Sequence, residues 1–387
     1  MAHYTDLGEF SDWVQFANEL SPLFPRAEPG PRTQRLVREA LSFEGEEAPR
    51  EVKLESSWKR EGLEGEEVSW SVGYGPRTRA WVLKPEGSST WGARLPAVVA
   101  LHDHGGWKFH GKEKIADGAQ GPLPLLEEFR AQAYGGRAWA NELARQGFVV
   151  LIHDTFCWGS RRFPLQTMTE HDRLVARALL LESSIVEPEV EPSEEEAEAR
   201  EFNLAAGQHE HLIEKYCHLL NTTMAGVVAF EDRVAASYLA SREDVDAERI
   251  GCAGLSGGGC RSALLQATCE RIKAAVIVGM MSTFEGLLDH NVATHTWMLL
   301  PSNWARWGDW SDLAACRAPS PLLVQFDKED TLFTPQGMQD AHERLAAHYA
   351  GVGAPQAYQG EFYEGGHKFD APMQQDAFAW LHKYLSG

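Results

Sequence analysis

Five short apolar runs, separated by longer stretches that include helical periodicity, constrain the fold of this 387-residue chain more than any other feature. The runs are 96–102 (PAVVALH), 147–154 (GFVVLIHD), 249–256 (RIGCAGLS), 274–280 (AAVIVGM) and 321–327 (PLLVQFD). They are rich in β-branched residues and apolar at consecutive positions, as is typical of strands buried on both faces of a sheet. The alternation predicts an α/β fold with a mostly parallel central sheet flanked by helices.

The remaining segments predict additions around this sheet. Phe10, Trp13 and Leu20 recur at helical spacing near the N-terminus, which predicts helices there. Two strands are expected from about Glu67 onward, joined by a turn at Gly75. The acidic run IVEPEVEPSEEEAEAREF interrupts the later alternation and is expected to be a solvated loop and helix face within an inserted cap. The expected division is a helical extension over 1–65, an α/β core over 66–162 and 221–387, and a helical cap over 163–220.

The net charge excludes some classes of partner. The formal charge of −20 repels phosphate backbones and anionic lipid headgroups, so we expect no nucleic-acid binding and no membrane association. The sequence contains no run of about eighteen apolar residues. Its first twenty residues lack the basic start and apolar run of a signal peptide, so a cytoplasmic location is expected. The six cysteines show no C-x-x-C spacing, and we expect them to be reduced and mostly buried.

The pattern G-x-S-x-G occurs at Gly254-Leu255-Ser256-Gly257-Gly258, between a predicted buried strand and a predicted helix. A serine on so tight a turn needs small neighbours, because its backbone is strained and the adjacent elements approach closely. The turn exposes the hydroxyl at the start of the helix, where the backbone N–H of Gly257 can stabilise an oxyanion. The alternative interpretation is a glycine-rich turn that binds phosphate.

A serine hydroxyl is a poor nucleophile near neutral pH, so it needs a base, and the base needs an orienting carboxylate. His367 lies in the segment FYEGGHKFD, after two glycines and before the final predicted helix, which places its imidazole on a short loop. The acid is expected just past the strand that ends at Asp327, where the loops of a parallel sheet meet ligands. Asp330 is our choice, and Asp327 is the alternative. The order Ser256, Asp330, His367 matches the chain order of such triads.

The segment LHDHGGWKFHGKEK follows the first apolar run and contains Gly105 and Gly106. These glycines allow the backbone to curl, so that the N–H of His104 or Gly105 can face the same oxyanion as Gly257. The alternative is a metal site made by His102, Asp103, His104 and His110. Their spacing matches no familiar zinc signature, and no metal is expected. A second polar run, QHEHLIEKYCH at 208–218, is expected to face water on a helix.

These pieces resemble the α/β-hydrolase superfamily, within it the branch of dienelactone-hydrolase-like and acetyl-xylan-esterase-like proteins. The matching segments are LKPEG, PAVVALHDHGG, DTFCWGSRR, REDVDAERIGCAGLSGGG, DLAACRAPSPLLVQFDKED and YEGGHKFD. They cover most of the chain from about residue 77 onward, except the insertion. The resemblance implies that Ser256, Asp330 and His367 form a catalytic triad. It also implies that Asp154 and Arg161 support the loop structure beside the site.

Two positions depart from the family pattern. Dienelactone hydrolases use a cysteine nucleophile where this chain has Ser256, and many relatives have glycine at the place of Asp327. The expected activity is hydrolysis of a carboxylic ester through an acyl-enzyme, and the resemblance implies a small acyl group on a carbohydrate or small metabolite. The alternatives are a peptidase, a carbon–carbon bond hydrolase and a non-catalytic binding protein on the same scaffold. No cofactor is required, and a homo-oligomer is compatible with the sequence.

Tryptophans are dense between positions 297 and 310. We expect Trp297 and Trp304 of this stretch, together with Trp158, to bind the small-molecule ester. Packing in the core is the equally weighted alternative for residues of this type.

Overall fold

The computed structural model describes residues 3–186 and 193–386, and its central feature is a nine-stranded sheet with the order β1-β2-β3-β5-β4-β6-β7-β8-β9. The strands from β5 to β9 in this order are parallel, whereas β1, β2 and β3 form antiparallel pairs. The strands are β1 (Arg50–Arg60), β2 (Leu63–Ser71), β3 (Thr78–Pro85), β4 (Leu95–Leu101), β5 (Val149–His153), β6 (Val245–Leu255), β7 (Ile272–Val278), β8 (Leu322–Asp327) and β9 (Tyr358–Tyr363).

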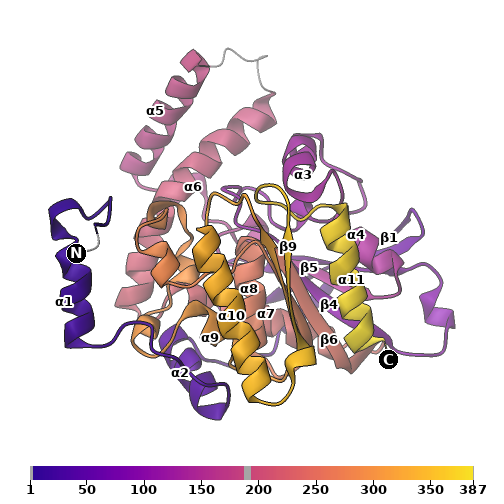
Figure 1. The fold of residues 1–387 in the computed structure, drawn as a ribbon. Helices are drawn as coiled ribbons and strands as arrows, with labels where there is room; N and C mark the ends of the chain where they lie inside the picture. Colours follow the sequence, from indigo (N-terminus) through magenta and orange to yellow (C-terminus); the bar gives the residue numbers. More distant parts are fainter. Residues whose placement is uncertain (1–2, 187–192, 387) are drawn as a thin grey trace.

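Helices cover both faces of this sheet (Figure 1). α4 and α11 pack on one face, and α7, α8 and α10 pack on the other, with α2 and α9 lying against them. The helices are α1 (Asp12–Leu20), α2 (Pro31–Leu41), α3 (Glu127–Tyr134), α4 (Trp139–Arg145), α5 (Glu170–Val186), α6 (Glu194–Leu219), α7 (Met224–Ala240), α8 (Gly257–Thr268), α9 (Trp310–Ala315), α10 (Pro335–Gly351) and α11 (Ala371–Leu385). The predicted α/β architecture is confirmed.

The parallel strands are apolar at consecutive positions because both of their faces are buried. Along β4, Val99 and Leu101 belong to the core on the α7 and α8 side, whereas Val98 and Ala100 belong to the core on the α4 and α11 side. A slip of one residue would exchange the two sets, so the two cores together fix the register. The strand ends, and the loops that follow them, are thereby fixed in position.

The sheet begins earlier in the chain than the sequence indicates. Strand β1 lies inside the segment 1–65 that we expected to be helical, and β2 begins at Leu63 rather than near Glu67. β1 is an edge strand whose residues are almost all exposed, so no apolar alternation marks it. Shifts in its register against β2 weaken the pattern further. Upstream of β1, α1 and α2 lie where helices are expected.

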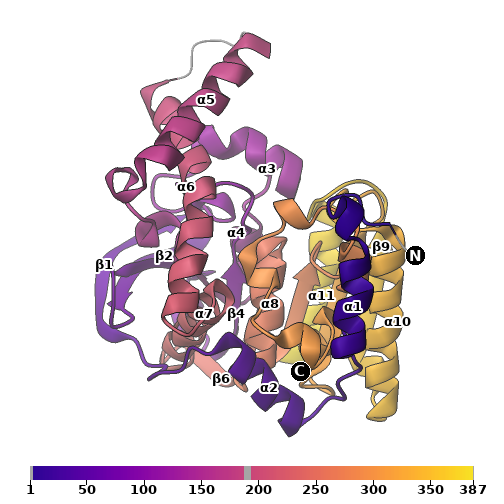
Figure 2. The ribbon, with the colours of Figure 1, turned by 90° about the vertical axis from the view of Figure 1, so that its left-hand side faces the viewer.

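A helical hairpin made of α5 and α6 is inserted between β5 and α7 and projects from the body (Figure 2). Because β5 ends and α7 begins at the carboxyl edge of the sheet, the hairpin rises from that edge. Helix α6 begins with a capping box between Ser193 and Glu196. Residues 187–192, which are part of the acidic run and of the expected cap, lie outside the described residues. Within the described part, none of the helices has both the length and the hydropathy needed to cross a bilayer.

Candidate active site

The carboxyl ends of the parallel strands bring the predicted site residues to one edge of the sheet. His104 follows β4, and Ser256 follows β6 directly. Asp330 and His367 follow β8 and β9. Residues that are far apart in the sequence therefore meet at one place.

Ser256 occupies the tight turn between β6 and α8, with φ 56° and ψ −122°. A residue with a side chain adopts such a positive φ only under strain. The turn also depends on Gly258, because a Cβ atom there would collide with the carbonyl oxygen of Leu101 at the end of β4. The G-x-S-x-G pattern therefore forms the predicted strand, tight turn and helix, with the serine at the start of α8.

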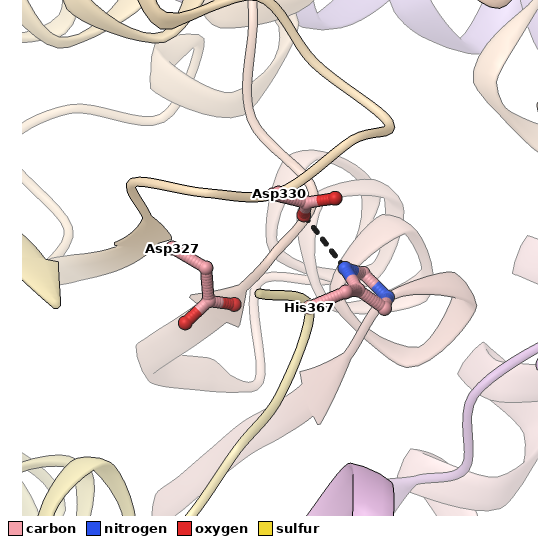
Figure 3. A group of neighbouring side chains, drawn as sticks. All are labelled: Asp327, Asp330 and His367. Atoms are coloured by element: carbon pink, nitrogen blue, oxygen red, sulfur yellow. Dashed lines mark hydrogen bonds and ion pairs between the residues drawn. The ribbon is translucent and has the colours of Figure 1, made fainter. Parts of the chain in front are cut away.

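His367 and Asp330 are in direct contact (Figure 3). The Nδ1 atom of the imidazole lies 2.7 Å from Oδ2 of Asp330, so the Nδ1–H donates to the carboxylate. The other ring nitrogen, Nε2, is buried and has no hydrogen-bond partner among the described residues. Since the carboxylate holds the proton on Nδ1, Nε2 keeps the lone pair that a general base needs.

The electrostatic surroundings of His367 favour its protonated form. Burial alone would lower the pKa of the imidazole, but the hydrogen bond to Asp330 and the negative charges of Asp330, Asp327 and Asp103 outweigh burial. The pKa of His367 is therefore raised above its usual value. An imidazolium that forms when Nε2 accepts a proton is stabilised in place.

Asp327, the alternative acid, lies beside this pair (Figure 3). Its Oδ2 accepts a hydrogen bond from the backbone N–H of Lys368 at 3.1 Å, and its Oδ1 is buried without a partner in the described part of the chain. Burial raises the pKa of Asp327 to about 7, although the N–H of Lys368 and the charge of His367 oppose this shift. The contact with the imidazole is thus made by Asp330, and Asp327 holds the loop next to it.

Ser256 and His367 line the same cavity, which has a volume of about 240 Å³. The predicted oxyanion residues His104, Gly105 and Gly257 also line it. Its apolar walls include Phe129, Met280 and Leu332. Sites for drug-sized ligands usually enclose about 300–1,000 Å³, so this cavity suits a small group.

The backbones of Gly257 and His104 approach each other closely at this cavity. A Cβ atom added to Gly257 would collide with the backbone nitrogen of His104. Gly105 has a φ of 55°, and a Cβ atom there would collide with the carboxylate of Asp103. Glycine is required at both positions, and the curled backbone brings the amide of His104 beside Gly257.

Two of the four residues considered as metal ligands, His102 and Asp103, make hydrogen bonds within this loop. The imidazole Nδ1 of His102 lies 3.0 Å from the carbonyl oxygen of Asp103, and the Asp103 carboxylate accepts from Nζ of Lys114 at 3.0 Å. Within the described residues, the group whose geometry could hold a metal ion is Asp327, Asp330 and His367, with ligand atoms within 4.8 Å of one another.

Asp154 and Arg161 each support loops near the site, but through different partners. Oδ1 of buried Asp154 accepts from the backbone N–H of Lys112, and Oδ2 accepts from that of Ser160, both at 2.9 Å. Arg161 forms a buried ion pair with Glu231 at 2.5 Å. Asp154 and Arg161, the two residues implied by the resemblance, thus support these loops through separate contacts.

The three tryptophans expected to bind substrate are not among the described residues that line this cavity. Trp304 is fully buried, and its indole N–H donates to the carbonyl oxygen of Asp309 at 2.8 Å. Trp158 is buried edge-on against the ring of His104, with centroids 5.2 Å apart. Trp297 is half-buried and donates to Nδ1 of His211 at 3.0 Å. Large aromatic side chains bury much apolar area, and for this reason they often pack in the core around a site.

The polar run 208–218 differs most from expectation. It lies on α6 as predicted, but His209, Glu210 and Glu214 are buried rather than facing water. Glu210 contacts His104, with 2.8 Å between Oε2 and Nε2. The alternation of polar residues carries no sign of the Glu210 contacts, because the partners of Glu210 come from a loop about a hundred positions away.

Comparisons with known proteins support this fold. No family model matches the chain. YtaP of Bacillus subtilis (strain 168), provisionally named a hydrolase, is 24% identical over 307 residues, which cover 79% of this chain and 83% of YtaP.

Solved structures of esterases are similar over most of the chain. A protein of Bacteroides fragilis NCTC 9343, provisionally named an acetyl xylan esterase, has a TM-score of 0.61 at 14% identity, covering 86% of this chain and 74% of its own. A promiscuous CE15 esterase from a marine bacterial metagenome has a TM-score of 0.58 at 14% identity, and the match covers 95% of this chain and 98% of the esterase. A glucuronoyl esterase from Solibacter usitatus has a TM-score of 0.57 at 11% identity, and the match covers 99% of this chain and 94% of that esterase. The chain has the α/β-hydrolase fold.

Proposed function

We propose that this protein is a serine hydrolase that cleaves a carboxylic ester with a small acyl group, using Ser256, His367 and Asp330. The observation that carries the proposal is the pairing of Asp330 with Nδ1 of His367, a residue that lines the same cavity as Ser256. The pairing leaves Nε2 without a hydrogen-bond partner among the described residues. The similarity to esterase structures agrees with this reaction class.

In the proposed reaction, Nε2 of His367 takes the proton of the Ser256 hydroxyl while Oγ attacks the ester carbonyl carbon. The backbone N–H groups of Gly257 and of His104 or Gly105 stabilise the negative charge on the carbonyl oxygen. The tetrahedral intermediate collapses, and the alcohol leaves with the proton from His367. Water then attacks the acyl-enzyme and gives a proton to Nε2, and the acid departs as Ser256 regains its hydrogen.

The cavity favours short acyl groups. About 240 Å³ bounded by Phe129, Met280 and Leu332 accommodates an acetyl-sized group more readily than a long chain. Acetyl groups on a carbohydrate or a small metabolite are the proposed substrates, since acetyl xylan esterases are among the similar structures.

The test measures hydrolysis of p-nitrophenyl esters with increasing acyl length, beside an N-acetylated peptide and a diketone. We expect acetate to be cleaved with the highest kcat/KM and Ser256→Ala to lower kcat by about 10³-fold or more. Cleavage of the peptide or the diketone with a higher kcat/KM would instead select one of the alternative reactions. An unchanged rate in a folded Ser256→Ala variant would overturn the proposal.

A further inference from the structure

Helix α6 of the helical hairpin contacts both ends of the loop that carries His104. Toward the start of the helix, Oδ1 of Asn203 accepts hydrogen bonds from the backbone N–H groups of Lys108 and Phe109, at 2.8 and 2.9 Å. About two turns later, Oε2 of Glu210 lies 2.8 Å from Nε2 of His104 and forms an ion pair with Lys108. Helix α6 is therefore joined to the loop by several polar contacts.

The contacts of Glu210 are buried. Glu210 is 5% exposed and Lys108 is 2% exposed. Burial alone would raise the pKa of Glu210, but the positive charge of Lys108 and the hydrogen bond to His104 hold this pKa well below its usual value. Because a buried charge is tolerated only when it is paired, Glu210 and Lys108 require each other.

The same contacts fix the ring of His104. The backbone N–H of Gly106 donates to Nδ1 at 3.2 Å, so Nδ1 is the acceptor and Nε2 carries the hydrogen that it donates to Glu210. Trp158 packs edge-on against the same ring. Glu210 therefore selects one tautomer and one orientation of a side chain whose own backbone amide lies beside Gly257.

We propose that Glu210 is a positioning residue for the oxyanion hole, acting from helix α6 through His104. This inference rests on the proposed function, because it assigns the His104 amide to the stabilisation of the transition-state oxyanion. Lys108 balances the charge of Glu210, and Asn203 anchors the other end of the loop. Helix α6 is thus part of the proposed catalytic geometry.

The test compares Glu210→Gln with Glu214→Gln. Glu214 lies one turn further along α6 and is also buried, but its carboxylate accepts from the backbone N–H of Met224 at 2.8 Å. We expect Glu210→Gln to lower kcat by about 10- to 100-fold with KM changed less than about twofold, because the oxyanion is stabilised mainly in the transition state. Glu214→Gln should leave both constants near the wild-type values.

A second readout separates positioning from general stability. Methylboronic acid forms a tetrahedral adduct with an activated serine, so its inhibition constant should rise in Glu210→Gln by the same factor by which kcat falls. The double variant Lys108→Met/Glu210→Gln removes both buried charges and should show the same loss of kcat if the single variant folds poorly. A wild-type kcat in the folded single or double variant would overturn the inference. Equal losses in Glu210→Gln and Glu214→Gln would overturn it too.

The two proposals fail in different ways. Failure of the proposed function appears in the wild-type protein, which would neither hydrolyse esters nor bind methylboronic acid. Failure of the positioning role appears only when the variants are compared with an active wild-type enzyme.

Discussion

Gly279 lies against the imidazole of His367, so that a Cβ atom built on the glycine would stand 3.0 Å from Cε1 of the ring and 3.1 Å from Nδ1. Gly279 also has a φ of 55°, which a residue with a side chain adopts only under strain. The glycine that follows β7 thus provides the space in which the imidazole reaches Asp330.

Replacing this glycine should displace the base. Gly279→Ala is expected to lower kcat by about 10- to 100-fold, because a methyl group pushes the ring away from its partners. It should also lower the free energy of unfolding by about 1 kcal/mol or more, since alanine is strained at this φ. Steady-state kinetics and denaturant unfolding measure the two effects.

Gly207 on α6 provides the matched control, because nothing lies within 4 Å of a Cβ atom built there. Gly207→Ala should keep wild-type kinetics and raise the free energy of unfolding by about 0.5–1 kcal/mol, as alanine favours a helix interior. Wild-type kcat in Gly279→Ala would contradict the assignment of His367 as base.

The pH dependence of activity should reflect the raised pKa of His367. The base must be neutral to accept a proton, so kcat/KM should fall on the acid side with a midpoint above the usual histidine value of about 6.5. Asp330→Asn removes a negative charge and a hydrogen bond that raise this pKa, so its midpoint should lie lower. A midpoint that does not move in Asp330→Asn would show that another group titrates.

Replacing each of the two carboxylates beside His367 should have very different effects on kcat. Asp330→Asn is expected to lower kcat by about 10³- to 10⁴-fold, because it favours the wrong imidazole tautomer. Asp327→Asn should keep most of the activity, since Asp327 bonds the backbone of Lys368 rather than the ring. The opposite ranking of the two kcat values would make Asp327 the orienting acid.

Asp327 should affect stability more than catalysis. Its pKa is raised to about 7 from 3.8, so the folded protein binds a proton at this site more tightly than the unfolded chain does. The charged carboxylate therefore lowers the free energy of unfolding. This loss is absent below about pH 3.8 and grows until the folded form has lost the proton above about pH 7. Asp327→Asn should therefore be stabilised relative to wild type at pH 8 more than at pH 5 in urea unfolding. Equal differences at the two pH values would contradict the raised pKa.

Trp304 should contribute to packing and not to substrate binding. Trp304→Phe loses a buried hydrogen bond and part of a ring, so the free energy of unfolding should fall by about 1–3 kcal/mol. The kcat/KM of the folded protein should stay near the wild-type value. The exposed Trp91 is the control, and Trp91→Phe should change neither quantity. A raised KM in Trp304→Phe at unchanged stability would instead indicate that Trp304 binds substrate.

Much of the core and the site is predictable because strong local constraints mark it. Strands buried on both faces must be apolar at consecutive positions, so β4 and β6 stand out in the sequence. The turn at Ser256 requires glycines at fixed offsets, and the segment around His367 carries its own glycines. The choice between Asp327 and Asp330 is not marked in this way, because it depends on a contact across two loops.

Other features leave no local signal. β1 is an exposed edge strand, so burial does not impose an alternation on Arg50–Arg60. Whether Trp304 packs or binds depends on what surrounds it, which spacing does not reveal. Glu210 looks like a solvated helix residue until the fold brings His104 and Lys108 against it. Long-range partners, rather than propensity, decide all three.

In the proposed reaction, His367 activates Ser256. The most direct measurement is intact and peptide mass spectrometry after brief exposure to a fluorophosphonate, on wild type and on His367→Ala. We expect a single adduct on Ser256 in the wild type and a rate of labelling at least about 10²-fold lower in the variant. Labelling of another residue, or equal rates in the two folded proteins, would contradict it.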